Sequence, residues 1–304
     1  MNDDVITPET KCGFVALVGA PNAGKSTLLN HLVGGKVSIV SHKVQTTRAL
    51  IRGIVAVDAT QIVFVDTPGI FKPKRRLDRA MVSTAWEGAE DADLAALLVD
   101  ARKGLDEDVE KILKGLSKRK RPKVLILNKI DLIPRDQLLE LSQKLNAQLE
   151  FDATFMVSAT RGDGCQDLLE FFADKLPQSP WLYPEDQMSD LPMRQLAAEI
   201  TREKLYERLH QELPYASTVE TERWEDMKSG DVRIEQTIYV ARTAHKKIVL
   251  GKGGDTIKAI SMAARKELSE IVERKVHLFL FVKVRERWLD DPERYRQMGI
   301  QFTD

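Results

Sequence analysis

Short apolar runs alternate with stretches of helical periodicity between Phe14 and Leu176. The runs are Phe14–Val18, Leu50–Val57, Ile62–Val65, Leu94–Val99, Val124–Leu127 and Phe155–Val157. This alternation is typical of a mostly parallel sheet with helices on both faces. Only four residues, including the turn Asp58-Ala59-Thr60, separate the second run from the third, which is too few for a crossover helix, so these two should form an antiparallel hairpin. The sequence therefore predicts an α/β domain with a mixed sheet.

The pattern changes where several prolines fall close together, from Pro177 to Pro192. We place a linker at residues 179–192, between a first domain at 1–178 and a second at 193–304. The second domain is predicted to contain a helix Met193–Leu213 with Asp190 as its N-cap, strands Ser217–Trp224 and Val232–Val240, a short helix, a helix Thr256–Val272 and a strand Val276–Val284. The predicted order α-β-β-α-α-β indicates an α+β domain. Phe279 and Phe281 share one face of the last strand, where we favour core packing over stacking on bases.

Composition excludes several classes of protein. No apolar run approaches the roughly 18 residues of a membrane span. The segment Met1–Thr10 lacks the features of an export signal, which indicates a cytoplasmic protein. Cys12 and Cys165 support neither a disulfide framework nor a zinc site. The net charge is zero, yet residues 242–287 carry twelve Lys or Arg against five acids, which favours a polyanion-binding face there, although a solvated helix face is the simpler interpretation of charge alone.

A phosphate-binding loop follows the first apolar run and precedes a helical stretch. The pattern G-x-x-x-x-G-K-[ST] runs from Gly19 to Ser26. Backbone N–H groups of such a loop surround a β-phosphate, Lys25 supplies positive charge, and Ser26 offers a hydroxyl to Mg²⁺. The predicted phosphate-binding residues are Gly19, Pro21, Asn22, Ala23, Gly24, Lys25, Ser26 and Thr27.

Two further elements predict a metal site and a switch. Asp66 and Gly69, in Asp-Thr-Pro-Gly after the third run, would hold Mg²⁺ through water and sense a γ-phosphate, respectively. The segment Lys36–Arg48 would complete the metal shell only when a γ-phosphate is present, which would make it a switch. We favour Thr46 over Thr47 as the residue that does so, although the sequence hardly distinguishes the two. We therefore predict Ser26, Thr46 and Asp66 as metal residues, and Lys25, Thr46 and Gly69 as catalytic residues. Arg48 could be an internal arginine finger, but a solvated side chain is the favoured interpretation.

A fourth element selects the base. Asn128-Lys129-Ile130-Asp131 follows a buried run, and the Asp131 carboxylate can accept two hydrogen bonds from guanine, whereas adenine offers no such donor pair. Ser158 and Ala159, after the next run, would cover the base with backbone N–H groups. The sequence therefore predicts a site for GTP and GDP.

With these motifs, nearly the whole chain resembles the Era family of bacterial GTPases, P-loop proteins with a C-terminal type II KH domain. The resemblance rests on the loop at Gly19–Ser26, Gln45–Arg48, Asp66–Gly69, Asn128–Asp131 and Val249–Gly254. It implies that the Gly-x-x-Gly loop clamps about four unpaired nucleotides. The RNA-binding residues it implies are Lys246, Lys247, Gly251, Lys252, Gly253, Gly254 and Lys258.

The same resemblance implies binding of a single-stranded segment near the 3′ end of small-subunit ribosomal RNA and assistance to assembly of that subunit. We also predict a monomer. The resemblance also implies association with the inner membrane face, for which the sequence offers no lipidation motif or basic amphipathic anchor. Ile70 stands where Ras-like proteins have a water-orienting glutamine, so we expect slow hydrolysis, with backbone groups, a second water or K⁺ near Asn22 holding the attacking water. An RNA-modifying enzyme and a protein-docking GTPase remain alternatives, and no second catalytic constellation in residues 195–304 supports the former.

Overall fold

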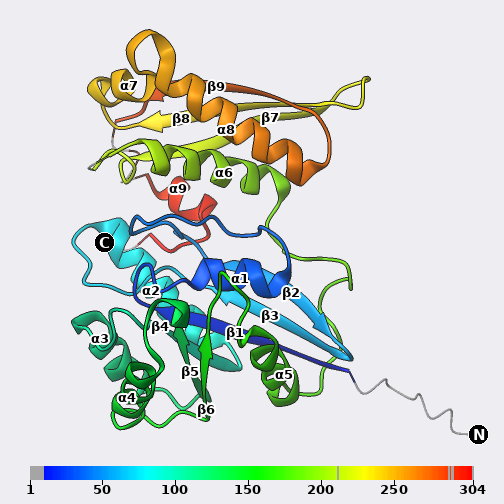
Figure 1. Ribbon diagram of the computed structural model, residues 1–304. Helices are drawn as coiled ribbons and strands as arrows, with labels where there is room; N and C mark the ends of the chain where they lie inside the picture. The colour runs from blue at the N-terminus through cyan, green and yellow to red at the C-terminus, as the bar shows by residue number, and fades with distance from the viewer. Residues whose placement is uncertain (1–9, 211, 287, 289–290, 303–304) are drawn as a thin grey trace, which may run out of the picture. The chain divides into compact units, whose positions relative to one another are not determined.

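The chain divides into two units. The computed structural model describes residues 10–210, 212–286, 288 and 291–302 (Figure 1). The first unit comprises the chain up to Ser38 together with Thr47–Asp190, and the second comprises Ile39–Thr46 together with the chain from Leu191. The expectation that no export signal is present rests on a segment that, apart from Thr10, lies outside the described residues.

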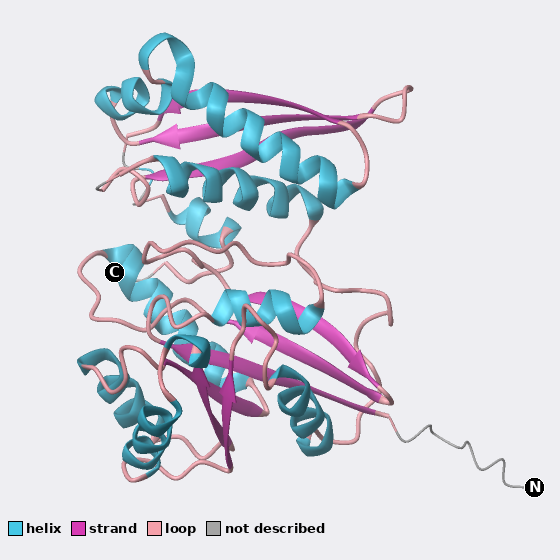
Figure 2. Ribbon diagram, viewed as in Figure 1, coloured by secondary structure: helices cyan, strands magenta, loops and turns pink. Residues whose placement is uncertain are grey.

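The first unit contains six strands and five α-helices among its described residues. They are β1 (Lys11–Gly19), α1 (Lys25–Val33), β2 (Ile51–Val57), β3 (Thr60–Asp66), α2 (Arg76–Asp91), β4 (Leu94–Asp100), α3 (Glu107–Leu116), β5 (Lys123–Asn128), the 3₁₀ turn η1 (Ile130–Leu132), α4 (Arg135–Asn146), β6 (Ala153–Val157) and α5 (Cys165–Lys175). The strand order is β2-β3-β1-β4-β5-β6, in which the β2–β3 pair is antiparallel and the others are parallel (Figure 2). The predicted mixed sheet with its hairpin is confirmed.

Two apolar layers hold helices on the faces of this sheet. Successive residues of β1 point to opposite faces, so Leu17 packs with α1 and α5, while Val18 packs with α2, α3 and α4. Both cysteines are free and buried. Because β3, β1, β4 and β5 run parallel, their carboxyl ends lie at one edge of the sheet, where the loops after β1, β3 and β5 come together.

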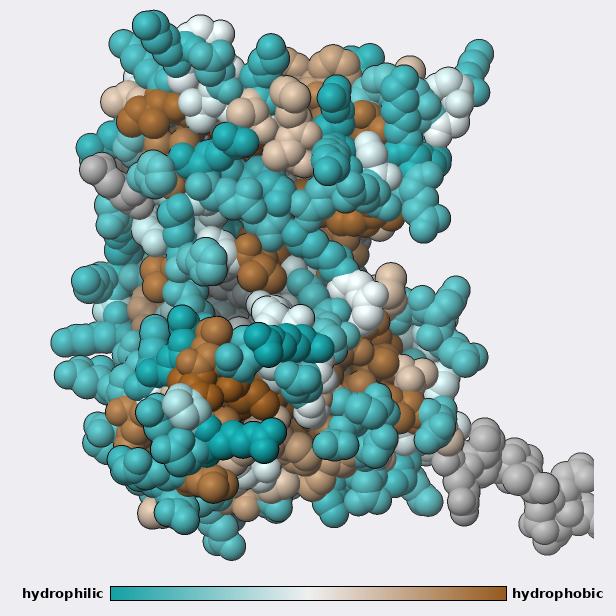
Figure 3. Space-filling model, viewed as in Figure 1, coloured by the Kyte–Doolittle hydropathy of each residue, from teal (hydrophilic) through white to brown (hydrophobic). Residues whose placement is uncertain are grey.

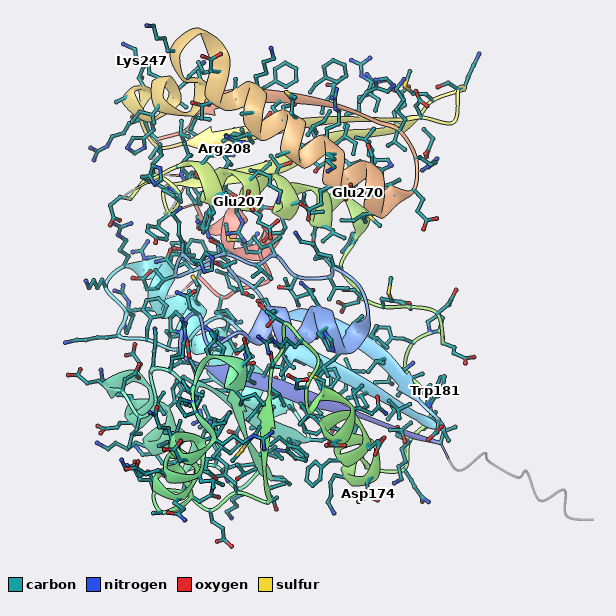
Figure 4. All side chains as sticks on the ribbon, in the orientation of Figure 1. Asp174, Trp181, Glu207, Arg208, Lys247 and Glu270 are labelled. Carbon is teal, nitrogen blue, oxygen red and sulfur yellow. The ribbon has the colours of Figure 1, made fainter. Side chains whose placement is uncertain are left out.

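The predicted linker is ordered along the first unit. Residues up to Asp190 belong to that unit, and they follow the open edge of β2. The Ile54 amide donates to the Met188 carbonyl at 2.9 Å, and Arg52 pairs with Asp190 at 2.7 Å. Near the β2–β3 turn, the Trp181 indole donates to the Ala59 carbonyl at 3.1 Å (Figure 4). Asp190 therefore binds Arg52 at this edge and is not the helix N-cap that the sequence predicted. Pro192 occupies the N-cap position.

The second unit has the predicted order of elements up to its last strand and adds a short helix after it. The elements are α6 (Met193–Arg208), β7 (Ser217–Asp226), β8 (Val232–Val240), α7 (Thr243–Leu250), the 3₁₀ turn η2 (Lys252–Gly254), α8 (Asp255–Val272), β9 (Val276–Val284) and the short α9 (Pro292–Gln297). The sheet order is β7-β8-β9, with β7 antiparallel and β9 parallel to β8. Helix α6 ends five residues before the predicted boundary because Leu209 is extended.

The helices of the second unit cover one face of its sheet. Leu205 of α6 and Ile260 of α8 pack with Ile238 and Val282 from the sheet. In the view of Figure 3, the surface of these helices is mainly hydrophilic, with smaller hydrophobic patches. The core packing favoured for Phe279 and Phe281 is wrong: both lie on the opposite face, 45% and 50% exposed, because the intervening residues of β9 point inward.

Among the described residues, no helix combines the length and apolar character that crossing a membrane requires.

Candidate functional site

The first loop of the site runs from the end of β1 to the start of α1. Gly24 precedes the helix with a φ of 100°, a left-handed conformation that favours glycine. A Cβ at this position would lie 2.2 Å from Nδ2 of Asn128, so a larger residue would displace the asparagine. The loop and the strand end that carries Asn128 are therefore built against each other.

Lys25 crosses this loop from its helix. Its buried ammonium donates to the carbonyls of Gly19 and Ala20, both at 3.1 Å. Burial lowers the pKa of Lys25 to about 8, although the nearby Asp66 carboxylate opposes the shift. Lys25 thus holds the loop together through two carbonyl groups. Among the described residues, no carboxylate is hydrogen-bonded to its ammonium, so the positive charge can pair with a phosphate.

Hydroxyl groups converge on Asp66 at the end of β3. Its Oδ2 accepts hydrogen bonds from Ser26 at 2.6 Å, from Ser38 at 2.9 Å and from Thr47 at 3.2 Å. Its Oδ1 is buried and has no hydrogen-bond partner among the described residues, and burial raises the pKa of this carboxyl. A buried carboxylate oxygen beside hydroxyl oxygens suits Mg²⁺, which prefers hard oxygen ligands. The residues present fit that ion, and Ser26 and Asp66 as its holders stay a prediction.

The structure separates the two threonines that the sequence left nearly equal. Thr47 is buried, and its hydroxyl lies 2.9 Å from that of Ser26 as well as beside Asp66. The Thr46 hydroxyl instead donates to the Lys43 carbonyl at 2.7 Å. Arg48 is only 5% exposed, so the solvated side chain favoured from the sequence is wrong. Ser38 was not predicted, because no motif marks it.

The loop after β3 rests on the phosphate-binding loop. The amide of Ile70 donates to the Gly19 carbonyl at 3.1 Å. Gly69 lies against Pro21, where an added Cβ would come within 2.9 Å of the proline Cα. The Ile70 side chain is buried. If Gly69 senses a γ-phosphate, as the sequence predicts, it does so in direct contact with the loop predicted to bind the phosphates.

The base-selecting residues form a linked set at the ends of β5 and β6. Asn128 donates from Nδ2 to the Ala23 carbonyl at 2.9 Å, and its Oδ1 accepts from the Ala159 amide at 3.1 Å. Ser158 donates its hydroxyl to Asp131 Oδ1 at 2.8 Å, which orients that carboxylate. Asn128 thus connects the phosphate loop to the strand end that would cover a base.

Lys129 is fixed by a residue that the motifs did not indicate. Its ammonium donates to the Asn22 carbonyl at 2.6 Å and to Oδ2 of Asp100 at 2.7 Å. Burial alone would raise the pKa of Asp100, but hydrogen bonds from Arg102 and Lys129 outweigh it and hold that pKa below its ordinary value. An acidic residue at the end of the buried run Leu94–Val99 was the available signal in the sequence.

The Gly-x-x-Gly loop joins α7 to α8 in the second unit. Gly251 has a φ of 76°, and an added Cβ would lie 2.3 Å from Oγ1 of Thr256. Gly253 and Gly254 face open space, with nothing within 4 Å of an added Cβ. The first glycine is therefore required by packing, while the other two leave the backbone accessible to a phosphate.

Lysines surround this loop. Lys247, Lys252 and Lys258 are exposed and Lys246 is half-buried. Lys247 points away from the body of the second unit in Figure 4. The predicted RNA-binding residues thus occur together on α7, the loop and the first turns of α8.

The segment Ile39–Thr46 packs against α6 within the second unit. The Val40 amide donates to Oε1 of Glu203 at 2.7 Å, and Arg202 donates to the Thr46 carbonyl at 2.5 Å. The Lys43 ammonium also donates to the carbonyl of Tyr206. Most of the predicted switch segment is therefore held by one helix of the domain that carries the Gly-x-x-Gly loop.

Two sequence families match the two units. The family described as 50S ribosome-binding GTPase matches residues 14–129, and the KH domain family matches residues 212–289. These matches cover the phosphate-binding loop and the Gly-x-x-Gly loop, respectively. They confirm the predicted fold class, a P-loop G domain followed by an α+β KH domain.

Similar proteins match the chain over nearly its whole length. GTPase Era of Sinorhizobium medicae is 67% identical over 96% of this chain and 94% of its own, and GTPase Era of Brucella suis is 65% identical over 97% and 94%. A crystal structure of an Aquifex aeolicus Era variant bound to GDP and AlF4⁻ matches with a TM-score of 0.90 and 38% identity, over 95% of this chain and 99% of that one. A structure of Era with MgGDPNP and nucleotides 1506–1542 of 16S ribosomal RNA matches with a TM-score of 0.89 and 37% identity, over the same shares. The chain belongs to the Era family of GTPases.

Proposed function

We propose that this chain is a GTP-hydrolysing switch that binds single-stranded RNA near the 3′ end of small-subunit ribosomal RNA and assists assembly of that subunit. One observation carries the proposal: the chain joins a linked guanine-nucleotide site, centred on Asn128, to an accessible Gly-x-x-Gly loop among lysines. The related Era structure with MgGDPNP and a 16S ribosomal RNA fragment supports it.

In the nucleotide site, we propose that the loop from Gly19 to Thr27 binds the phosphates and that Lys25 neutralises their charge. Asp131 accepts hydrogen bonds from guanine, oriented by Ser158, while Ala159 and Lys129 border the base. Ser26 and Asp66 would hold Mg²⁺, which would supply charge stabilisation for phosphoryl transfer. The contacts of Thr47 favour it over Thr46 as the switch threonine in that shell.

Hydrolysis is slow in this proposal because the site has no side chain at position 70 that can orient water. Ile70 is buried and apolar, so Gly69 and other backbone groups are left to position the attacking water. K⁺ near Asn22 would add a positive charge at the phosphates. Single-turnover hydrolysis in K⁺ and in Na⁺, with wild type and Asn22→Ala, tests the cation; equal rates in all four reactions contradict a role for K⁺.

For RNA, we propose that Gly253 and Gly254 let phosphates approach the backbone while Lys246, Lys247, Lys252 and Lys258 supply charge. The direct test is RNA binding by wild type and Gly254→Asp. The new side chain meets open space, and aspartate tolerates left-handed backbone, so the fold should persist while the carboxylate repels the phosphate. Unchanged RNA affinity in this variant would favour a protein-docking domain instead.

Nucleotide state and RNA binding are coupled through the switch segment. Thr47 belongs to the cluster at Asp66, whereas the residues before it are held by Glu203 and Arg202 of α6. Ordering of Thr47 by Mg²⁺ and GTP would therefore change the contacts that the preceding residues make with α6. Linkage then requires two equal effects. RNA must raise the affinity for GTP, relative to GDP, by the same factor by which GTP, relative to GDP, raises the affinity for RNA. Equal RNA affinity in both nucleotide states contradicts the coupling.

The remaining part of the proposal concerns the setting of the protein. We propose a monomer that acts in the cytoplasm and associates peripherally with the inner membrane face. Sedimentation of the purified chain tests the first statement. Fractionation of cells, with a salt wash of the membranes, tests the second, because a peripheral protein is released by the wash.

A further inference from the structure

The outer face of the three-stranded sheet carries exposed aromatic side chains. In β9, Phe279 and Phe281 alternate with inward residues and are 45% and 50% exposed. Side chains two residues apart on a strand lie about 6.6–6.8 Å apart, so these rings stand side by side along one line. Tyr239 occupies the same face of the neighbouring strand, since it pairs in register with Lys283, two residues beyond Phe281.

Cationic groups border these rings. The Arg233 guanidinium lies 5.0 Å from the centroid of the Phe279 ring, and Arg285 lies 5.9 Å from that of Tyr239. Lys283 is exposed beyond Phe281, and the structure gives its ammonium no ion pair with a described residue. Acids also lie here: Glu235 pairs with Arg233 at 2.7 Å, and Glu222 accepts a hydrogen bond from Tyr239 at 3.0 Å. Arg285 also pairs with Asp291 at 2.9 Å. The face thus combines aromatic surfaces with cations, which suits a phosphodiester chain with unpaired bases better than an apolar protein surface.

This face is continuous with the Gly-x-x-Gly side of the domain. β9 is an edge strand, and its last residue pairs with Val240, three residues before α7 begins. Helix α7, whose far end leads into the loop, packs against β9. An RNA strand longer than the roughly four nucleotides that such a loop holds can therefore pass the edge of β9 and reach Phe281.

We propose that Phe279 and Phe281 form a second RNA-binding surface, on which two unpaired bases beyond the Gly-x-x-Gly loop stack. This inference rests on the proposed RNA-binding function and extends it to the opposite face of the domain. Aromatic side chains on a sheet surface bind successive bases in this way in other folds, and stacking tolerates any base because each presents a π-face.

The test compares a short and a long RNA with the full chain. Fluorescence anisotropy would measure binding of a single-stranded five-nucleotide RNA and of a fifteen-nucleotide RNA that begins with the same five. The double variant Phe279→Ser, Phe281→Ser should bind the long RNA at least tenfold more weakly and the short RNA within twofold of wild type. Leu139→Ser, at an exposed apolar position of α4, is the matched control and should change neither.

The single variants Phe281→Trp and Phe281→Leu separate stacking from apolar contact. Tryptophan keeps the π-face and should retain binding of the long RNA, whereas leucine keeps only the apolar surface and should weaken it. Equal affinity of wild type and the double variant for the long RNA overturns the proposal. Full binding by Phe281→Leu also overturns it, because an apolar surface would then bind the RNA as well as a stacked ring. Gly254→Asp, which should weaken binding of both RNAs, tests the loop separately. The proposed RNA-binding function can therefore hold even if the double variant shows that Phe279 and Phe281 bind no RNA.

Discussion

Lys25 should take up a proton when nucleotide binds at mildly alkaline pH. Burial lowers its pKa to about 8 in the protein without nucleotide, whereas the phosphates of GDP would keep it protonated. With that pKa, about three quarters of Lys25 is neutral at pH 8.5 and about a tenth at pH 7. Binding of GDP should therefore take up about 0.75 proton at pH 8.5, and GDP should bind about fourfold more weakly there than at pH 7.

Isothermal titration calorimetry with GDP, in two buffers of different protonation enthalpy, measures this uptake. The titrations omit Mg²⁺, because the raised pKa of Asp66 would otherwise allow metal binding to release a proton from that carboxyl. At pH 8.5 the phosphates of GDP are already ionised, since their last pKa is about 6. The control is Lys25→Arg, whose guanidinium stays protonated and should show no uptake.

Uptake near zero in wild type at pH 8.5 would refute this reasoning, because it would mean that the buried lysine is already charged. The same shift has a second consequence in the protein without nucleotide. The unfolded chain holds a proton on this lysine up to its ordinary pKa of 10.5, which the folded chain has lost above about 8. The contribution of Lys25 to folding stability should therefore rise with pH between these values and be lost as pH falls through 8.

Three further substitutions address the base, the RNA loop and the switch. Asp131→Asn should weaken GTP at least 100-fold and allow xanthosine triphosphate to bind, because the new amide donates where the carboxylate accepted; fluorescent nucleotide titration measures both. Gly251→Ala crowds the first turn of α8 and should lower unfolding free energy by about 1–3 kcal/mol in urea denaturation while GTP affinity stays unchanged; an equally stable variant contradicts the packing. Arg202→Met removes the donor to the Thr46 carbonyl and should abolish the difference in RNA affinity between GTP and GDP states, whereas Arg194→Met on the same helix should preserve it.

The sequence was most informative where backbone chemistry dictates a motif. The glycines and lysine of the first loop and the pair Asn128 and Asp131 are each required by a contact that few residue types can make, so their spacing predicted the nucleotide site. The apolar runs predicted the strands within a few residues, because buried strands must be apolar along their length.

Positions that depend on distant partners were not predictable in this way. Asp190 looks like a helix cap from its neighbours, yet Arg52, far away in the sequence, pairs with it. Phe279 and Phe281 look like core residues because their strand is apolar on both faces, and only the pairing of β9 decides which face is covered. Ser38 supports the site through a side chain that no local pattern marks, whereas the position of Asp100 at the end of a buried run marks the residue but not its partner Lys129.

The path of the connector along β2 protects the protein from self-association. An edge strand presents free amide and carbonyl groups, which can template pairing with another chain. In this fold Met188 accepts from the Ile54 amide, and Ser189 donates to the Arg52 carbonyl at 2.7 Å, so the connector occupies part of that edge. The segment that links the domains therefore also caps the G-domain sheet, and its detachment would expose a strand able to nucleate aggregation.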